Sequence, residues 1–301
     1  MKLMILSACV FLIVSLFSLT LSFEKAKRQT FHEPQKVLAY NTSSKIIPLL
    51  KNDAVPPVVS AQGALAVDLD TGVSLYQKDA DKKLFPASTT KIMTALIALE
   101  NYSLDEALEV KRSGVEGQKM RLILGERMKV ENLLNGLLIF SANDAAEVFA
   151  DNFPEGRESY VDQMNKLARK LNLADTRFEN PTGLDGNSQV TSARDMIRLT
   201  SYAMKNPIFR RIVSTKELTV YNIEGTIPHK LKNLNELLGE VEGVVGVKTG
   251  WTENARENLV TYVERDDRRI AMVLLGSQDR FGETKELIEW IFSEYDWVYS
   301  P

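Results

Sequence analysis

The order of strand-like and helix-like patterns along the 301-residue chain constrains its fold more than any other feature. Short stretches with the alternation typical of strands lie near both ends of the sequence, at 64–76 and beyond residue 244. The region between them, about 100–210, instead shows the period of amphipathic helices. We therefore predict an α/β (α+β) fold, with an antiparallel sheet flanked by helices and a mostly helical subdomain inserted between its strands.

The individual elements follow from the same periods. Two hairpins are predicted, at 64–76 around a turn ending in Gly72, and at 258–276 around Asp266 and Asp267. A further strand is predicted at 244–249. Helical periods are found at 88–100, 130–152, 157–173, 192–205 and 283–295.

The chain begins with an apolar run, residues 3–23, which is followed by two lysines and an arginine. The run is long enough to cross a bilayer, and Thr20 and Ser22 offer only a weak cleavage site. We expect residues 1–28 to be either a signal peptide or an N-terminal membrane anchor. Either alternative places the rest of the chain outside the cytoplasm, secreted, periplasmic or held at the cell membrane.

Residues 29–59 are punctuated by prolines and are predicted to be a spacer. The folded domain is expected at 60–301, with its helical subdomain at about 100–210.

The net charge and the small number of histidines and cysteines argue against two classes of function, nucleic-acid binding and zinc-dependent chemistry. The net charge is −3 and the sequence has no long basic run, so nucleic acid is not an expected partner. The only cysteine is Cys9, and the two histidines, His32 and His229, are far apart. We therefore expect no zinc site of the usual ligand types, and no cofactor.

Ser88 and Lys91 enclose the first motif that indicates chemistry, Ser-Thr-Thr-Lys. Residues three apart on a helix share a face, so the hydroxyl and the amine can meet. A serine hydroxyl needs a nearby base, and a lysine can serve if burial lowers its pKa. Taken alone, the motif is equally consistent with a solvated helix turn.

Two further motifs follow along the chain. Ser141-Ala142-Asn143 comes after an apolar run and offers a hydroxyl and an amide, although a polar junction between helices would look the same. Lys248-Thr249-Gly250 ends a predicted strand and supplies a charge, a hydroxyl and close access to the backbone. By itself it is also consistent with a strand that ends in a turn.

In this order the three motifs resemble those of the low-molecular-mass D-alanyl-D-alanine carboxypeptidases, serine peptidases of family S11 in the penicillin-binding superfamily. The resemblance runs from about Ala64 to Trp290 and includes longer stretches at 85–95, 134–146, 180–184 and 191–196. It implies a β-lactamase/transpeptidase-like fold, with 60–301 as the DD-peptidase catalytic domain. One departure is Trp251, because many relatives carry a histidine there.

The resemblance implies an acyl-enzyme mechanism. Ser88 is expected to attack the carbonyl of the penultimate D-Ala while Lys91 takes its proton. Ser141 is expected to relay a proton to the leaving amine, and Asn143 to bind the substrate backbone. The backbone N–H groups of Ser88 and Trp251 are expected to form the oxyanion hole.

The substrate's terminal carboxylate is expected to lie at the third motif. Lys248 and Thr249 offer charge and a hydroxyl there, and Gly250 leaves room for the ligand. Arg280 is the candidate for a further cationic contact, and an exposed loop arginine is the alternative interpretation.

The expected partners are a peptidoglycan pentapeptide ending in D-Ala-D-Ala and β-lactam antibiotics as covalent inhibitors, with membrane contact through the N-terminal segment. Two alternatives remain: a DD-endopeptidase that cuts peptidoglycan cross-links, and a catalytically idle penicillin-binding sensor or scaffold. A β-lactamase is disfavoured, because Glu179 and Asn180 are adjacent and not spaced as Glu-x-x-x-Asn.

Overall fold

The computed structural model describes residues 46–299, so the predicted signal or anchor lies outside the described residues. Part of the predicted spacer is folded: strand β1 (Ile46–Leu50) pairs antiparallel with strand β11 (Tyr295–Tyr299). Within the described range, every helix is too short or too polar to span a bilayer.

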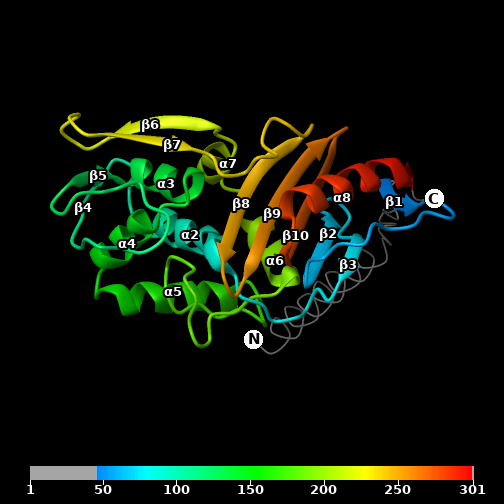
Figure 1. Cartoon of the computed structure of the whole chain (residues 1–301), viewed down its shortest axis with the longest axis horizontal. Coiled ribbons are helices and arrows are strands. Elements are labelled where there is room, and N and C mark those ends of the chain that lie inside the picture. Colours follow the sequence, from blue (N-terminus) through cyan, green and yellow to red (C-terminus); the bar gives the residue numbers. More distant parts are fainter. Residues whose placement is uncertain (1–45, 300–301) are drawn as a thin grey trace, which may run out of the picture. The chain divides into compact units, whose positions relative to one another are not determined.

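A five-stranded antiparallel sheet forms the centre of the fold, in the order β3-β2-β10-β9-β8 (Figure 1). Strand β2, which precedes the helical region, pairs with β10, which follows it, so strands from both ends of the sequence share one sheet as predicted. Strand β8 lies at one edge of this sheet. The strands are β2 (Gly63–Asp68), β3 (Ser74–Lys78), β8 (Val244–Thr252), β9 (Arg256–Arg265) and β10 (Arg268–Ser277).

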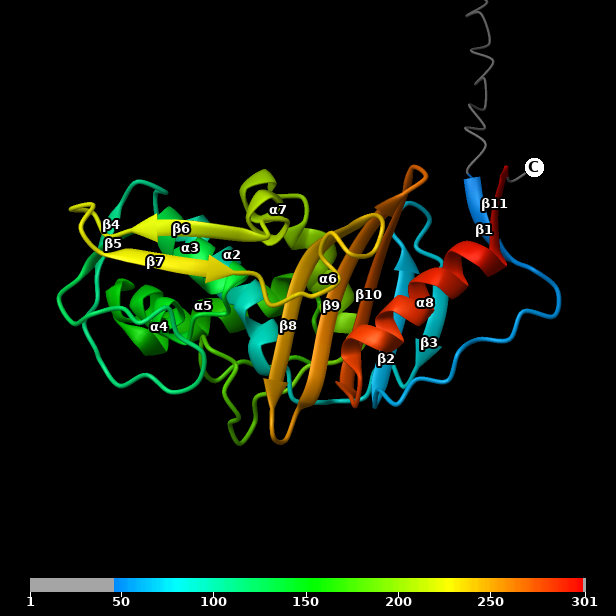
Figure 2. The ribbon, with the colours of Figure 1, turned by 45° about the horizontal axis from the view of Figure 1, so that its top comes forward.

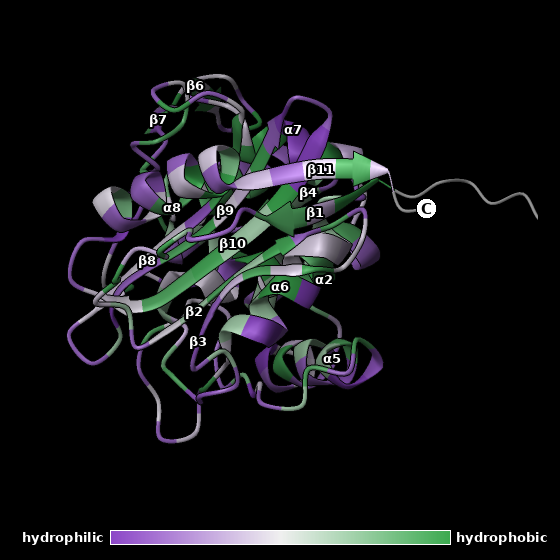
Figure 3. Ribbon diagram, turned by 90° about the vertical axis from the view of Figure 1, so that its right-hand side faces the viewer, coloured by the Kyte–Doolittle hydropathy of each residue, from purple (hydrophilic) through white to green (hydrophobic). Residues whose placement is uncertain are grey.

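Helices cover both faces of this sheet. Helix α6 (Ala193–Ala203) packs on β2 and β10 from one side, and α8 (Arg280–Glu294) packs on β9 and β10 from the other. Figure 3 shows the apolar strands between these two helices. Each helix buries one apolar face, for example Leu287, Ile288 and Ile291 of α8, which are at most 1% exposed.

The helical subdomain lies beside strand β8 and carries two small two-stranded sheets, β4–β5 and β6–β7 (Figure 2). The sequence periods did not predict these four short strands or helix α7. The helices are α2 (Lys91–Asn101), α3 (Val130–Ile139), α4 (Asn143–Asn152), α5 (Arg157–Lys170) and α7 (Pro207–Val213). The small strands are β4 (Ala107–Glu109), β5 (Arg127–Lys129), β6 (Glu217–Tyr221) and β7 (Pro228–Lys232).

One helical prediction is wrong in detail. The continuous period at 130–152 belongs to two helices, α3 and α4, which are separated by a sharp corner. The corner is made by Ser141, whose φ of 61° lies in the left-handed region that a helix cannot contain. Apolar spacing continues on both sides of the corner because both helices bury a face in the same core.

Candidate active site

All three sequence motifs meet at one groove of about 640 Å³. Ser88, Ser141, Asn143, the end of β8 and Arg280 all line it. Lys91 and Lys248 lie buried next to the serines that line the groove. Segments from the sheet, the helical subdomain and helix α8 thus build one site.

Ser88 lies in a single 3₁₀ turn, η1 (Ala87–Thr90), which continues directly into α2. Two glycines allow other segments to approach this turn closely. A Cβ added at Gly183, whose φ is 87°, would lie 1.9 Å from the carbonyl oxygen of Ala87. A Cβ added at Gly250 would lie 3.1 Å from the backbone nitrogen of Ser88. Two backbones therefore enclose the nucleophile turn: the one at Gly183 requires glycine, and a side chain at Gly250 would fit only if the turn shifted slightly.

Asn258 holds the segment before the nucleophile turn, a role that the sequence analysis missed. Its fully buried amide donates hydrogen bonds to the carbonyls of Phe85 (2.9 Å) and Pro86 (3.0 Å). Its Oδ1 accepts from the backbone N–H of Gly276 on β10. An asparagine within an otherwise apolar buried strand was the signal that could have revealed this role.

Lys91 is fully buried, and its Nζ lies 3.0 Å from Ser88 Oγ. It also donates a hydrogen bond to the carbonyl of Thr182. Burial lowers the pKa of Lys91 to about 7, against the opposing effect of the Asp144 carboxylate. A large share of this amine is therefore neutral near pH 7 and can accept the serine proton.

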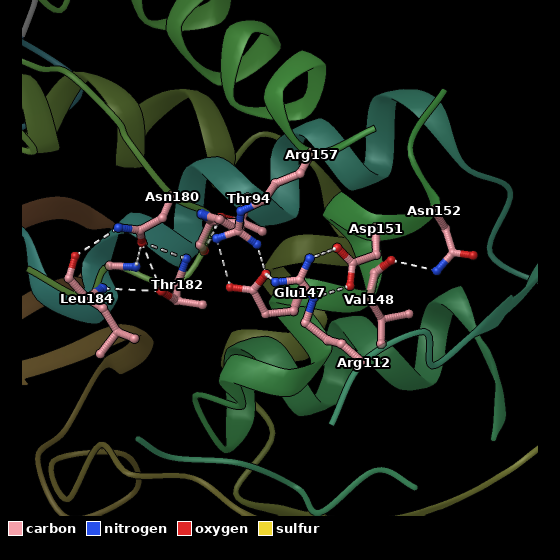
Figure 4. A network of polar contacts seen from close by, with 12 residues as sticks. Thr94, Arg112, Glu147, Val148, Asp151, Asn152, Arg157, Asn180, Thr182 and Leu184 are labelled. Carbon is pink, nitrogen blue, oxygen red and sulfur yellow. Dashed lines mark hydrogen bonds and ion pairs between the residues drawn. The ribbon is translucent and has the colours of Figure 1, made fainter. Parts of the chain in front are cut away.

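The segment at 180–184, noted as family-like in the sequence, positions the Thr182 carbonyl. Oδ1 of Asn180 accepts hydrogen bonds from the backbone N–H groups of Thr182 (3.2 Å) and Gly183 (2.8 Å) (Figure 4). The Asn180 amide in turn donates to the carbonyl of Leu184. The segment is thus folded around one asparagine side chain, which places the Thr182 carbonyl against Lys91.

Ser141, like Ser88, is in contact with a buried lysine. The buried Nζ of Lys248 donates to Ser141 Oγ and to the carbonyl of Thr249, both at 2.9 Å. Burial, followed by the positive charges of Lys91 and Arg280, holds the pKa of Lys248 well below its ordinary value. Each serine of the site therefore lies against an amine whose charge the surroundings disfavour.

Asn143 begins helix α4 and faces the β4–β5 loop (residues 110–126). Its amide donates to the carbonyl of Glu116 (2.7 Å), and its backbone N–H donates to the carbonyl of Gln118 (2.7 Å). Oδ1 of Asn143 is buried and has no hydrogen-bond partner within 46–299. Because Asn143 lines the groove, this buried acceptor lacks a partner next to the place where a ligand would bind.

The groove residues of β8 differ in exposure. Thr249 is 5% exposed, whereas Trp251 is 64% exposed at the rim. Arg280 is the first residue of α8, and its Nη1 donates to the carbonyl of Gly250 at 3.0 Å. The structure therefore brings Arg280 into the groove, and the alternative of an exposed loop arginine is wrong. Elsewhere in residues 46–299, no three His, Cys, Asp or Glu side chains are grouped as a metal site would require.

Comparison with known proteins agrees with this geometry. The family described as D-alanyl-D-alanine carboxypeptidase matches residues 51–279. The chain belongs to this family. The family assignment confirms the resemblance found in the sequence and the predicted enzyme class, serine-type D-alanyl-D-alanine carboxypeptidases.

Individual relatives span different shares of this carboxypeptidase-family chain. D-alanyl-D-alanine carboxypeptidase DacF of Bacillus subtilis is 33% identical over 78% of this chain, which spans 63% of the length of DacF. A D-alanyl-D-alanine endopeptidase of Pseudomonas aeruginosa is 30% identical over 77% of each chain. The crystal structure of the Streptomyces K15 DD-transpeptidase has a TM-score of 0.74 and 30% identity, covering 79% of this chain and 99% of that one. This likeness confirms the predicted transpeptidase-like fold.

Proposed function

We propose that this protein is a serine-type D-Ala-D-Ala carboxypeptidase that shortens peptidoglycan stem peptides through an acyl-enzyme on Ser88. One observation supports this most directly. The fully buried Lys91 has a pKa of about 7, and its Nζ lies 3.0 Å from Ser88 Oγ. A neutral amine at hydrogen-bonding distance is the base that a serine nucleophile requires.

In the proposed acylation step, Ser88 Oγ bonds to the carbonyl carbon of the penultimate D-Ala, and its proton passes to Lys91 Nζ. The backbone N–H groups of Ser88 and Trp251 stabilise the oxyanion. The bond from this carbon to the nitrogen of the last D-Ala then breaks. Ser141, held by Lys248, relays the proton from Lys91 to the leaving amine, which leaves Lys91 neutral again. Water later attacks the ester carbonyl and gives its proton to Lys91, and Lys91 passes that proton to Ser88 Oγ as the ester bond breaks.

The terminal carboxylate is proposed to bind where β8 ends. Thr249 and Arg280 line the groove there, with the buried Lys248 directly behind Thr249, and an extended peptide can pair with β8 because this strand lies at the sheet edge. Asn143 then accepts from a peptide N–H through its free Oδ1. Gly250 lets the end of β8 pack closely against the nucleophile turn, since a Cβ there would lie 3.1 Å from the backbone nitrogen of Ser88.

Product analysis tests this proposal against its alternatives. The full chain is incubated with a pentapeptide ending in D-Ala-D-Ala and with cross-linked muropeptides, and products are separated by chromatography. Release of free D-Ala from the pentapeptide supports the carboxypeptidase. Cleavage of cross-links without D-Ala release would instead support the endopeptidase, the activity that the Pseudomonas relative's name describes. Covalent penicillin labelling without either product would support an idle sensor or scaffold.

We further propose that the catalytic domain works outside the cytoplasm and that residues 1–28 hold it at the membrane. The apolar run at 3–23 is long enough to span a bilayer, and its cleavage site is weak. Membrane fractionation followed by N-terminal sequencing tests this. Recovery in the membrane fraction with an uncleaved N-terminus is expected. Soluble mature protein that starts near Phe23 would refute the anchor.

A further inference from the structure

The β4–β5 loop (residues 110–126) forms one wall of the groove through Glu116, Gly117 and Gln118. This loop contains no helix or strand, so its shape depends on contacts made by other segments. At its start, Arg112 forms a two-bond pair with Asp151 of α4, both bonds at 2.6 Å (Figure 4). Nearer the groove, the carbonyls of Glu116 and Gln118 accept from Asn143.

Three of the following loop residues, Met120, Leu122 and Ile123, are held by acidic side chains. The Asp144 carboxylate accepts from the backbone N–H groups of Met120 (3.1 Å) and Leu122 (3.0 Å). The Glu126 carboxylate accepts from the backbone N–H of Ile123 at 2.8 Å. Asp144 directly follows Asn143, so the same corner of α4 fixes the loop and carries the substrate-binding amide.

His229, on strand β7, holds the loop from the side opposite to α4. Its Nδ1 lies 2.9 Å from the carbonyl oxygen of Met120, and its Nε2 lies 2.6 Å from Glu126 Oε1. The side chains of His229 and Glu126 are only 4% and 1% exposed. Sequence analysis noted His229 only as a residue that could not form a zinc site.

The hydrogen-bond geometry fixes the proton on Nδ1. A carbonyl oxygen can only accept, so the contact with Met120 requires a proton on Nδ1 of His229. A second proton then lies between Nε2 and the carboxylate of Glu126. The histidine is therefore a donor to the loop backbone, and Glu126 holds its ring in the orientation that makes this bond.

Met120 transmits this restraint to the catalytic corner. Its sulfur packs so closely on helix α3 that a Cβ added at Gly136 would lie 2.3 Å from it, and Gly136 also approaches Ala142. The carbonyl of Gly136 accepts from the backbone N–H of Ala142, which lies between Ser141 and Asn143. Movement of Met120 would therefore disturb the residues that flank the groove.

We propose that His229 and Glu126 are positioning residues of the substrate groove. They fix the β4–β5 loop at Met120 and Ile123, and thereby keep Asn143 and Glu116 in the geometry that binds the peptide. The inference rests on the proposed peptidase function and adds two residues that do not touch the substrate. It assigns the β6–β7 hairpin a role in substrate binding, since His229 comes from that hairpin.

Three variants of the full chain separate positioning from plain stability. His229→Leu removes the donor and leaves Glu126 buried without its partner, so both stability and binding should suffer. The double variant H229L/E126L removes both side chains of the buried pair and should recover part of the stability that His229→Leu loses, although the carbonyl of Met120 and the N–H of Ile123 still lose their partners. Asn222→Ala is the control: it loosens the turn of the same hairpin, where Asn222 Oδ1 accepts from Thr226 and Ile227, and leaves the loop contacts intact.

The readouts are D-Ala release kinetics and urea unfolding. For H229L/E126L we expect KM for the pentapeptide to rise about five- to tenfold while kcat stays nearly unchanged. This is the effect of losing one hydrogen bond that stabilises the bound substrate and the transition state equally. Acylation by penicillanic acid, which has no 6-substituent and so lacks the N–H that Asn143 would bind, should change much less. Asn222→Ala should lose stability and keep its KM.

Two outcomes would overturn the inference. In the first, H229L/E126L regains both stability and the wild-type KM, so that the pair serves folding alone. In the second, Asn222→Ala raises KM as much as the double variant, so that hairpin stability is the cause. Wild-type protein that releases no D-Ala would instead refute the proposed function, which keeps the two failures apart.

Discussion

Raising the pH through neutrality is expected to switch on acylation of Ser88, because Lys91 must lose its proton before it can accept one. Burial lowers the pKa of this amine from the ordinary value of 10.5 to about 7. The catalytically competent form is the neutral one, so activity is present above this pKa and is lost as the pH falls through it.

The size of the effect follows from the shift. An unperturbed lysine would be neutral in roughly one molecule in three thousand at pH 7, whereas Lys91 is neutral in about half. Burial thus raises the concentration of usable base about a thousandfold at that pH. The acylation rate should be about one tenth of its maximum at pH 6 and about nine tenths at pH 8.

The assay is the second-order rate of covalent labelling by a fluorescent penicillin between pH 5 and 9. Thermal unfolding at each pH confirms that the protein remains folded. Lys91→Arg is the matched control, because its guanidinium stays charged at every pH tested and should leave labelling at background. A wild-type rate that is flat from pH 5.5 to 8.5, or that rises only above pH 9, would refute the role given to Lys91.

Two further predictions concern recognition and packing. Arg280→Ala should lower kcat/KM on free D-Ala-D-Ala ends about ten- to hundredfold, the effect of one charge-assisted contact, and should affect amidated ends much less; equal losses on both, measured by D-Ala or D-alaninamide release, would make Arg280 a folding residue. Gly183→Ala should unfold the nucleophile turn and abolish penicillin labelling, because its Cβ would lie 1.9 Å from the Ala87 carbonyl. Gly114→Ala, also at positive φ but with nothing within 4 Å, should cost only about 1 kcal/mol in urea unfolding and keep its labelling.

The sequence predicted the sheet and most helices because their buried faces repeat with a regular period. It placed Ser88 and Lys91 together for the same reason, since both belong to one helical turn. The helical period gave a wrong prediction at Ser141, because the apolar spacing continues across the corner between α3 and α4. Only the positive φ of Ser141 shows that corner. The short pairing of β1 with β11 also lacked a signal, because each strand buries only one of its five residues.

Other parts of the site depend on contacts between distant segments, which no local pattern encodes. The Thr182 carbonyl reaches Lys91 across 91 residues, and Asn258 reaches Phe85 across 173. The β4–β5 loop has no period at all, yet it forms a wall of the groove because Asn143, Asp144 and His229 satisfy its backbone. In the sequence alone such residues cannot be distinguished from other polar residues, because their hydrogen-bond partners lie far away along the chain.

The most direct test of the central claim is intact-protein mass spectrometry of wild-type protein and Ser88→Ala after incubation with benzylpenicillin. The account predicts a single adduct of the full penicillin mass on the wild-type protein, mapped to Ser88 by peptide analysis. The variant should show no adduct and release no D-Ala, although its thermal unfolding should match the wild type. A covalent adduct retained in Ser88→Ala, or one that maps to another residue, would contradict the assignment of the nucleophile.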